Sequence, residues 1–181
     1  LQSSIGVEAM IREDLTKVLG LEIDRAALYG TGTANQPLGL SGISGIASVE
    51  LSEYGTFEEM VALETAIFSA NADGNALKYL FNTATRGALK TTQKAPGTNG
   101  VMVLEGGEVN GYQTVTSNQV AAKDIFFGDW SQFVIGLWGG LDLMTDPYAG
   151  ATSGNVRVIA LQSVDFVVKQ PTAFALGQDL A

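Results

Sequence analysis

The sequence contains no cysteine and no histidine among its 181 residues. Without cysteine the chain forms no disulfide, offers no thiolate to a metal and has no thiol nucleophile. Without histidine it cannot build a Ser-His-Asp triad or a zinc site of the HExxH type, and it lacks the side chain that titrates nearest neutral pH. These absences exclude most hydrolase designs, so we expect no enzymatic activity, no catalytic residues, no metal site and no cofactor.

Positive charge is scarce as well. Ten Lys and Arg residues stand against nineteen Asp and Glu residues, which gives a formal net charge of −9. Such a chain repels phosphate backbones, and it contains neither a basic run nor aromatic residues interleaved with Lys or Arg. We therefore do not expect a dedicated nucleic-acid-binding protein.

Long apolar runs are also missing, since no stretch approaches the roughly 18 to 20 residues that span a bilayer. No membrane partner is expected. The first residue, Leu1, is neither an initiator Met nor part of a basic and then apolar signal peptide. We therefore interpret Leu1 as an internal position of a longer protein.

The chain does contain enough apolar material for a core, since 46% of its residues are hydrophobic. Apolar residues recur at three- and four-residue steps from Ser4 to Leu28, which predicts one long amphipathic helix. Glu13 and Lys17 have the i,i+4 spacing of a weak surface ion pair. We therefore expect the packing of an apolar stripe to hold this helix, the stripe being Ile5, Met10, Ile11, Leu15, Val18, Leu19 and Leu21.

A glycine-rich stretch, YGTGTANQPLGLSGI, follows this helix from Tyr29 to Ile43. Phosphate-binding loops place such glycines after a strand and before a helix, so that the helix N-terminus faces the phosphate. Here the glycines come after a helix, the third glycine of a dinucleotide fingerprint is missing, and no Gly-Lys-Ser or Gly-Lys-Thr occurs. We interpret Gly30 and Gly32 as a helix stop, followed by a rigid, extended connector before Pro37 that changes direction between two subdomains.

Two further helices are predicted in the middle of the chain. Thr56 and Glu59 have capping-box spacing at the start of one, and Asn82 and Thr83 can cap the other over roughly residues 84–92. From Val101 onward the pattern changes to strands, over residues 112–116, 125–127, 133–137, 141–144 and 156–169. Helices first and strands later, without a repeated βαβ rhythm, predict an α+β fold.

Two groups of residues are candidates for chemistry. Asp129, Asp142 and Asp146 could act as paired carboxylates or as oxygen ligands for calcium, but their neighbours are typical of strand ends and turns, where Asp is common. An aromatic zone could line a sugar pocket, form a protein interface or pack in the core, and we favour the core for most of its members. It comprises Phe126, Phe127, Trp130, Phe133, Trp138 and Tyr148. Trp130, Trp138 and Asp129 are thus candidates for an interface or the core.

Four blocks of the sequence resemble, in the same order, the C-terminal two-thirds of tailed-bacteriophage major capsid proteins with the Hong Kong 97-type fold. They are LEIDRAALYGTGTANQPLGL, TVTSNQV, IFFGDWSQFVIGLWGGLDLMTDPY and VRVIALQSVDFVVKQPTAFAL. The Gly-Asp-Trp-Ser block around Asp129 and the connector are the most specific parts. The connector residues that carry the resemblance are Gly30, Gly32, Gln36, Pro37 and Gly39.

The resemblance implies a capsid fold with a long spine helix, a discontinuous peripheral (P) domain and an axial (A) domain. Residues 1–40 would form the P-domain spine helix and the connector, and residues 41–132 the A domain. Residues 133–161 would form P-domain strands, and residues 162–181 would return to the A-domain sheet. We expect the N-terminal arm and the extended loop that family members carry before the spine helix to lie outside this sequence.

The resemblance also implies a function, that of a structural subunit of a phage or prophage icosahedral capsid. Such subunits assemble in the bacterial host cytoplasm into a virion shell that encloses DNA without sequence-specific binding. The implied partners are copies of the chain in pentamers and hexamers, together with a scaffold, a portal and a maturation protease. The surplus of negative charge suits a shell that does not adhere to its DNA.

Two alternatives are left open by the residues. One keeps the fold and makes the chain an encapsulin-like bacterial compartment shell that holds an enzyme cargo. The other is a non-viral ligand-binding domain or hydrolase, which would use the aromatic zone and require Asp129, Asp142 and Asp146 to converge on a concave pocket.

Overall fold

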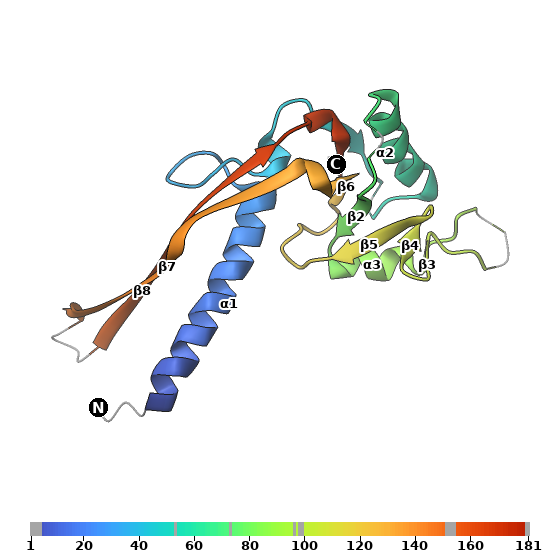
Figure 1. The fold of residues 1–181 in the computed structure, drawn as a ribbon. Coiled ribbons are helices and arrows are strands. Elements are labelled where there is room, and N and C mark those ends of the chain that lie inside the picture. Colours follow the sequence, from blue (N-terminus) through green and yellow to red (C-terminus); the bar gives the residue numbers. More distant parts are fainter. Residues whose placement is uncertain are drawn as a thin grey trace.

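The computed structural model describes residues 5–52, 54–72, 74–95, 97, 100–150 and 155–179. They form two regions, a seven-stranded sheet with short helices against it and an elongated arm (Figure 1). The arm consists of helix α1 (Ile5–Tyr29) and a two-stranded ribbon of β7 (Phe133–Gly150) and β8 (Asn155–Val168). We call the other region the sheet domain. The chain starts in the arm, builds most of the sheet domain, returns to the arm and ends in the sheet.

Helix α1 confirms the predicted long helix, although Ser4 lies outside the described residues. The predicted pair of Glu13 and Lys17 is present, with 2.7 Å between the Lys17 Nζ and Glu13 Oε1 atoms. This pair is largely exposed, so it contributes only a few tenths of a kcal/mol. The helix ends at Tyr29, directly before Gly30, as the glycine stop predicts.

The sheet domain is a mixed sheet with the strand order β1-β9-β6-β2-β5-β4-β3. Strand β9 pairs parallel with β1 and antiparallel with β6, so the end of the chain is inserted between the first strand of the sheet domain and β6. The strands are β1 (Ala47–Glu50), β2 (Leu77–Phe81), β3 (Leu104–Glu105), β4 (Glu108–Val109), β5 (Tyr112–Thr116), β6 (Ile125–Asp129) and β9 (Phe174–Gln178). Strands were predicted at the positions of β5 and β6, whereas the short strands β1, β3 and β4 were not predicted.

Two helices accompany this sheet. Helix α2 (Phe57–Ser69) packs over β1, β9 and β6, and its predicted capping box is confirmed, because Thr56 and Glu59 exchange side-chain and backbone hydrogen bonds. Helix α3 (Thr83–Leu89) is capped by Asn82, whose side chain accepts a hydrogen bond from the Ala84 N–H. Both helix starts therefore follow the local capping signals, and α3 ends slightly earlier than predicted.

The main core lies in the sheet domain. Tyr79 and Phe127 face each other across the paired strands β2 and β6, with their rings stacked 4.2 Å apart, and both side chains are fully buried. The Tyr79 hydroxyl donates to the Met60 carbonyl of α2 at 3.0 Å, which satisfies its polar atom inside the core. These contacts hold α2 against the centre of the sheet.

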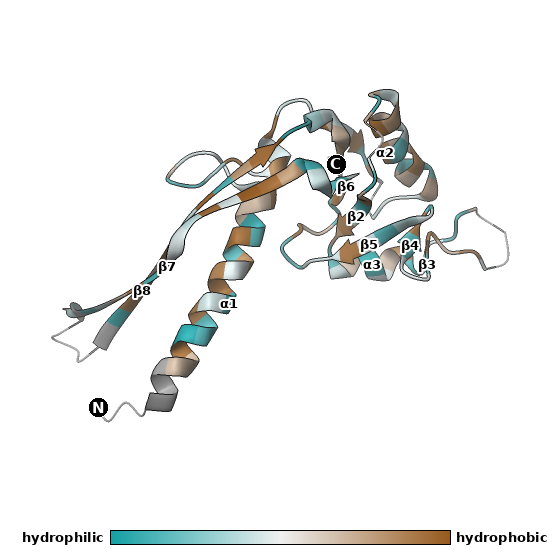
Figure 2. Cartoon of the chain, viewed as in Figure 1, coloured by the Kyte–Doolittle hydropathy of each residue, from teal (hydrophilic) through white to brown (hydrophobic). Residues whose placement is uncertain are grey.

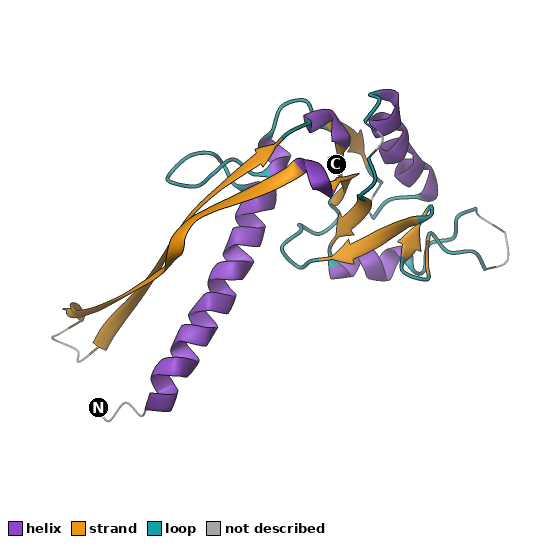
Figure 3. Ribbon diagram, viewed as in Figure 1, coloured by secondary structure: helices purple, strands orange, loops and turns teal. Residues whose placement is uncertain are grey.

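The ribbon continues as two paired strands well beyond the sheet domain (Figure 3). The sequence predicted two short strands, over residues 133–137 and 141–144, but β7 is a single strand with a register shift between Trp138 and Asp142. Gly139 in this shift has a positive φ of 72°, which glycine adopts without the strain of a side chain. The glycines therefore produce a bulge within one strand and not a break between two.

Candidate assembly surfaces

The outer part of α1 exposes apolar side chains. Met10, Val18 and Leu21 are 61%, 63% and 52% exposed, and apolar residues recur along the length of the helix (Figure 2). The sequence predicted that this apolar stripe packs against the rest of the chain and holds the helix. Within a single chain this prediction is wrong. The reason is that the ribbon and the sheet domain reach α1 only near its C-terminal end, where Ala26, Ala27 and Leu28 are buried.

A small core joins the two parts of the arm at this end. Ala26 and Ala27 pack against Phe166 of β8, which is 6% exposed and stacks on the ring of Phe133 at 5.9 Å. Small residues on the helix let the ribbon approach closely, and the two stacked rings close the junction. The base of the arm is thus held by a few residues, and the rest of the helix and the ribbon extend from it.

The connector after α1 folds back on itself. Gly39 N–H donates to the Gly30 carbonyl at 2.9 Å, and Thr31 and Leu38 form an antiparallel bridge, so the expected extended run is a tight loop. A Cβ atom on Gly39 would lie 2.3 Å from the Gly30 nitrogen and 2.7 Å from the Ala26 carbonyl oxygen. Glycine is needed here because the two backbones touch at the end of the helix.

The connector residues take different places within this loop. Gly32 has a positive φ of 68° and its N–H donates to the Pro37 carbonyl at 3.3 Å, while the Gln36 N–H donates to the Thr33 carbonyl at 3.1 Å. Directly after the loop, Leu40 is fully buried in the core of the sheet domain. The loop therefore fixes the point at which the chain leaves the arm.

Tyr29, the last residue of α1, ties the arm to the sheet domain. Its hydroxyl donates to Asp124 Oδ2 at 2.7 Å and accepts from the Ala121 N–H at 3.0 Å. Burial and then the hydrogen bond to Asp124 raise the pKa of Tyr29 well above its ordinary value, outweighing the opposite effect of the Ala121 N–H. The phenol therefore stays protonated, and its ring also meets Phe126 edge to face at 5.7 Å.

The ribbon is the second apolar surface of the arm. Leu137 and Trp138 are 60% and 59% exposed, and they point to opposite faces because they are neighbours in a strand. The indole of Trp138 lies against Gly136, where an added Cβ would come within 2.7 Å of the ring. Further exposed apolar side chains of the ribbon are Val134, Ile135, Met144, Tyr148, Leu161 and Val167.

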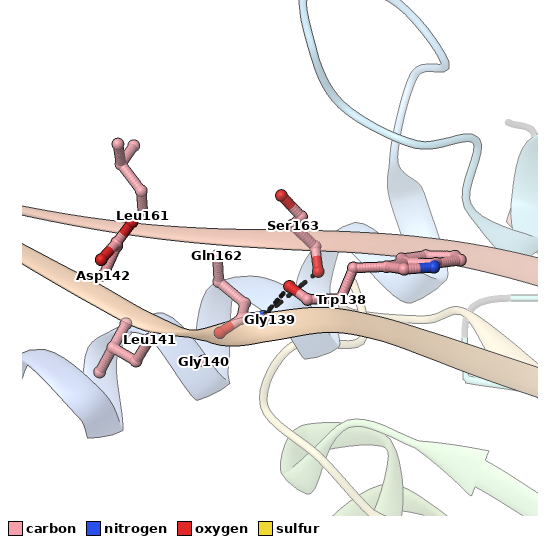
Figure 4. A pocket seen from close by; sticks show the side chains of 8 residues that line it. All are labelled: Trp138, Gly139, Gly140, Leu141, Asp142, Leu161, Gln162 and Ser163. Atoms are coloured by element: carbon pink, nitrogen blue, oxygen red, sulfur yellow. Dashed lines mark hydrogen bonds between the residues drawn. The ribbon is translucent and has the colours of Figure 1, made fainter.

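The bulge in β7 forms a shallow hollow of about 550 Å³ in the ribbon. Trp138 lies at one end of it, and Asp142 and Leu161 lie at the other (Figure 4). Between them the Gln162 side chain donates to the carbonyls of Trp138 and Ser163, each at 3.2 Å, which fixes the shape of the bulge. The hollow is open and carries one carboxylate, so it offers an uneven surface for contact and no catalytic pair.

The predicted aromatic zone is divided between the two regions. Phe126 and Phe127 are buried in the sheet, and Trp130 is half-buried with its Nε1–H donating to the Lys78 carbonyl at 3.1 Å. Trp138 and Tyr148, by contrast, stand on the exposed ribbon. The structure therefore places Trp130 against the core and Trp138 on the surface.

The three candidate carboxylates do not converge. Asp129 is 3% exposed and its Oδ1 accepts from the Ser131 N–H at 3.0 Å, while Asp146 Oδ1 accepts from the N–H groups of Tyr148 and Ala149. Asp129 and Asp146 thus hold local turns, and Asp142 borders the hollow. Within the described ranges no three acidic side chains come together to hold a metal ion, so the convergent pocket of the ligand-binding alternative is not formed.

The exposed apolar residues of the ribbon escaped the sequence prediction. Residues 133–138 read FVIGLW, with no polar residue on either face of the strand, and we favoured the core only for most of the aromatic zone. The lack of alternation between apolar and polar residues was the available signal. A strand that is apolar on both faces must be covered on both faces, either by its own chain or by another molecule. In the described part of the chain, no helix has the length and apolar character needed to cross a membrane.

The comparison with known sequences places the chain among capsid proteins. A model described as the phage capsid family matches residues 1–179. The major capsid protein of Halomonas phage phiHAP-1 is 37% identical over 177 residues, which cover 98% of this chain and 29% of that protein. The chain thus spans less than a third of the length of this curated relative.

Solved structures show the same architecture. The capsid of an empty GTA particle superimposes with a TM-score of 0.74 at 19% identity, covering 100% of this chain and 69% of that chain. The capsid of Myoviridae phage XM1 gives a TM-score of 0.68 at 11% identity, covering 97% and 66%. Mycobacterium phage Che8 gives a TM-score of 0.65 at 16% identity, covering 97% of this chain and 64% of that chain. These likenesses concern the fold.

Proposed function

The chain belongs to the phage capsid family and has the Hong Kong 97-type fold, and from this we propose that it forms the body of a major capsid protein. Copies of this protein assemble into an icosahedral shell that encloses phage DNA. The chain acts in this proposal by fitting against other copies and carries out no reaction. The virion capsid is its place of action, reached by assembly in the host cytoplasm.

The exposed apolar surface of the arm is the observation that carries this proposal. Large exposed apolar patches on a folded chain mark contact sites, and here they follow both α1 and the ribbon. A monomer would leave Met10, Val18, Leu137 and Trp138 in water, whereas a neighbouring subunit would cover them. Burying such side chains gives roughly 1.5 to 3 kcal/mol each at full burial, which favours association.

We assign the two regions to the two domains of the capsid fold. The arm, with residues 1–40 and β7 and β8, corresponds to the P domain, and the sheet domain with residues 41–132 corresponds to the A domain. Sheet membership supports this division, because β7 and β8 pair only with each other among the described strands. Residues 162–168 still pair with β7, so we place the return to the A domain after Val168.

The proposed partners follow from a closed shell. Copies meet in pentamers and hexamers, and a scaffold, a portal and a maturation protease act during assembly. The net charge of −9 supports DNA packaging without adhesion, because an acidic surface repels the phosphate backbone. Contact surfaces must then supply enough apolar area to outweigh the repulsion between like-charged copies.

The test is an assembly experiment on the full-length protein that carries this chain. Electron microscopy and sedimentation should show closed particles for the unaltered protein. The double variant L137S/W138S should remain folded but stay unassembled, because it removes the apolar side chains from both faces of the ribbon. The matched control is Phe68→Ser in helix α2 of the sheet domain, where Phe68 is 39% exposed and assembly should continue. A full-length protein that stays monomeric with its scaffold present would overturn the proposal.

A further inference from the structure

Positive charge is concentrated in one segment of this acidic chain. Residues 74–104 contain four basic side chains, Lys78, Arg86, Lys90 and Lys94, and no Asp or Glu. Setting these four cations aside from the net charge of −9 leaves −13 on the rest of the chain. The rest of the chain is therefore strongly acidic, and this segment is the part that attracts the acidic surface of a second copy.

Helix α3 presents two of these cations to solvent. Arg86 and Lys90 lie one helical turn apart at the end of α3, and both are exposed. Neither makes an ion pair with any residue in the described part of the chain. Lys94 differs, because it is half-buried with its Nζ atom 5.1 Å from the centre of the Phe57 ring. The free cations of this surface are thus Arg86 and Lys90.

The hairpin of β3 and β4 carries the opposite charge at the same end of the sheet. Glu105 and Glu108 are direct partners across the two strands, joined by Gly106 and Gly107, and both are exposed. Like charges directly opposite one another destabilise a strand pair, and neither glutamate makes an ion pair with a residue in the described ranges. The cost suggests that the two glutamates meet a cation outside their own chain.

We propose that Arg86 and Lys90 of one copy pair with Glu105 and Glu108 of a neighbouring copy in the shell. The proposal rests on the proposed function. Glu105 and Glu108 lie on the β3-β4 edge of the sheet, and the segment after α3 pairs with the segment before β3 through the bridge of Gln93 with Met102. This end of the sheet domain lies away from α1, so the contact is separate from the apolar surfaces of the arm (Figure 1). Complementary charges at this end favour one register of neighbouring copies, because a shifted register brings like charges together.

Charge reversal and restoration in the full-length protein test this contact. R86E/K90E and E105K/E108K should each raise the protein concentration needed for half-maximal assembly by about tenfold or more, because attraction becomes repulsion. The quadruple variant R86E/K90E/E105K/E108K restores complementary charges and keeps the net charge of the unaltered protein. Its concentration for half-maximal assembly should lie within about twofold of that of the unaltered protein, since the same pairs form with exchanged signs.

K169E is the matched control for the single variant R86E, since each reversal changes the net charge equally and the exposed Lys169 lies outside α1, the ribbon and the β3-β4 hairpin. The melting temperature of each variant separates loss of assembly from loss of folding. The proposed contact would be overturned if the charge reversals left the concentration for half-maximal assembly unchanged, or if the control raised it as much. A quadruple variant that folds but fails to assemble would overturn it as well. If the unaltered full-length protein forms no shell at all, the proposed function fails instead.

Discussion

The sheet domain and the arm use aromatic residues in opposite ways. Tyr79 and Phe127 of the sheet domain are fully buried, whereas Trp138 and Tyr148 of the arm are 59% and 86% exposed. The sheet domain therefore obtains its stability from its own chain. The arm, beyond its base at Ala26, Ala27 and Phe166, leaves its apolar surface for other molecules. One chain thus combines a self-sufficient core with a region that becomes complete only by association.

Replacing Phe127 by Ala tests this contrast with the largest expected effect. The variant should lose about 3 to 5 kcal/mol in the free energy of unfolding, because it opens a cavity beneath the stacked Tyr79 ring. The matched arm variant, Trp138→Ala, should lose less than about 1 kcal/mol, since most of the indole already lies in water. Denaturant titrations of both variants give the two values. Equal losses in the free energy of unfolding would mean that Trp138 contributes as much to the stability of the single chain as Phe127 does.

Two glycines, one in the connector and one in α1, provide the next test. Gly39→Ala should destabilise the chain by about 2 kcal/mol or more, because the added Cβ meets the backbone of Gly30 and Ala26. Gly20→Ala is the control, since nothing lies within 4 Å of the added Cβ inside α1, and it should be neutral or stabilise by up to about 1 kcal/mol. Thermal unfolding of both variants checks the opposite signs. A tolerated Gly39→Ala change would contradict the close packing of the connector.

Tyr29→Phe addresses the connection between the two regions. Removing the hydroxyl leaves Asp124, which is 9% exposed, without this donor and should lower the free energy of unfolding by about 1 to 2 kcal/mol. Tyr148→Phe removes a hydroxyl from the most exposed aromatic residue of the ribbon and should leave stability unchanged. Hydrogen exchange should locate the Tyr29→Phe effect at residues 121–124, and an unchanged exchange rate there would exclude this tie.

The smallest expected effect concerns pH and the capping box of α2. Burial acts to raise the pKa of Glu59, but hydrogen bonds from Thr56 and Ser52 outweigh it, so its pKa lies below the ordinary value. A depressed folded pKa stabilises the fold above the unfolded pKa, and this contribution disappears as the pH falls through the folded value.

Glu59→Gln measures that contribution. The variant should be about 0.5 to 1 kcal/mol less stable than the unaltered chain at pH 7, and the difference should shrink towards pH 3. Glu58→Gln removes a charge from the same helical turn, without the hydrogen bonds that Glu59 makes, and serves as the control. A difference between Glu59→Gln and the unaltered chain that stays constant with pH would refute the linkage.

Local signals predicted several elements well. The long helix, its glycine stop, the Thr56 capping box and the Asn82 cap depend on residues within a few positions of each other, and all are confirmed. The family resemblance is confirmed as well, because the phage capsid family model matches residues 1–179. The break between residues 137 and 141 was predicted wrongly, since a glycine bulge and a strand end have the same sequence signature.

Exposure could not be predicted in this way. The stripe on α1 was expected to pack within the chain, and Trp138 was left as a candidate for an interface or the core. Apolar periodicity indicates that a surface will be covered, but it does not indicate which molecule covers it. In the same way, the connector was expected to be extended, whereas contacts between Gly30 and Gly39 close it into a loop. These features depend on how distant segments meet.

The amino-acid sequence alone therefore determined the helix ends, the strand-forming segments, the acidic balance and the family, since each depends on nearby residues or on composition. Tertiary structure decided that the final strand enters the sheet between β1 and β6, that Asp129 is separated from Asp142, and that the arm remains uncovered. The physical reason is that burial is a property of pairs of surfaces, and the partner surface lies far away in the chain or outside it.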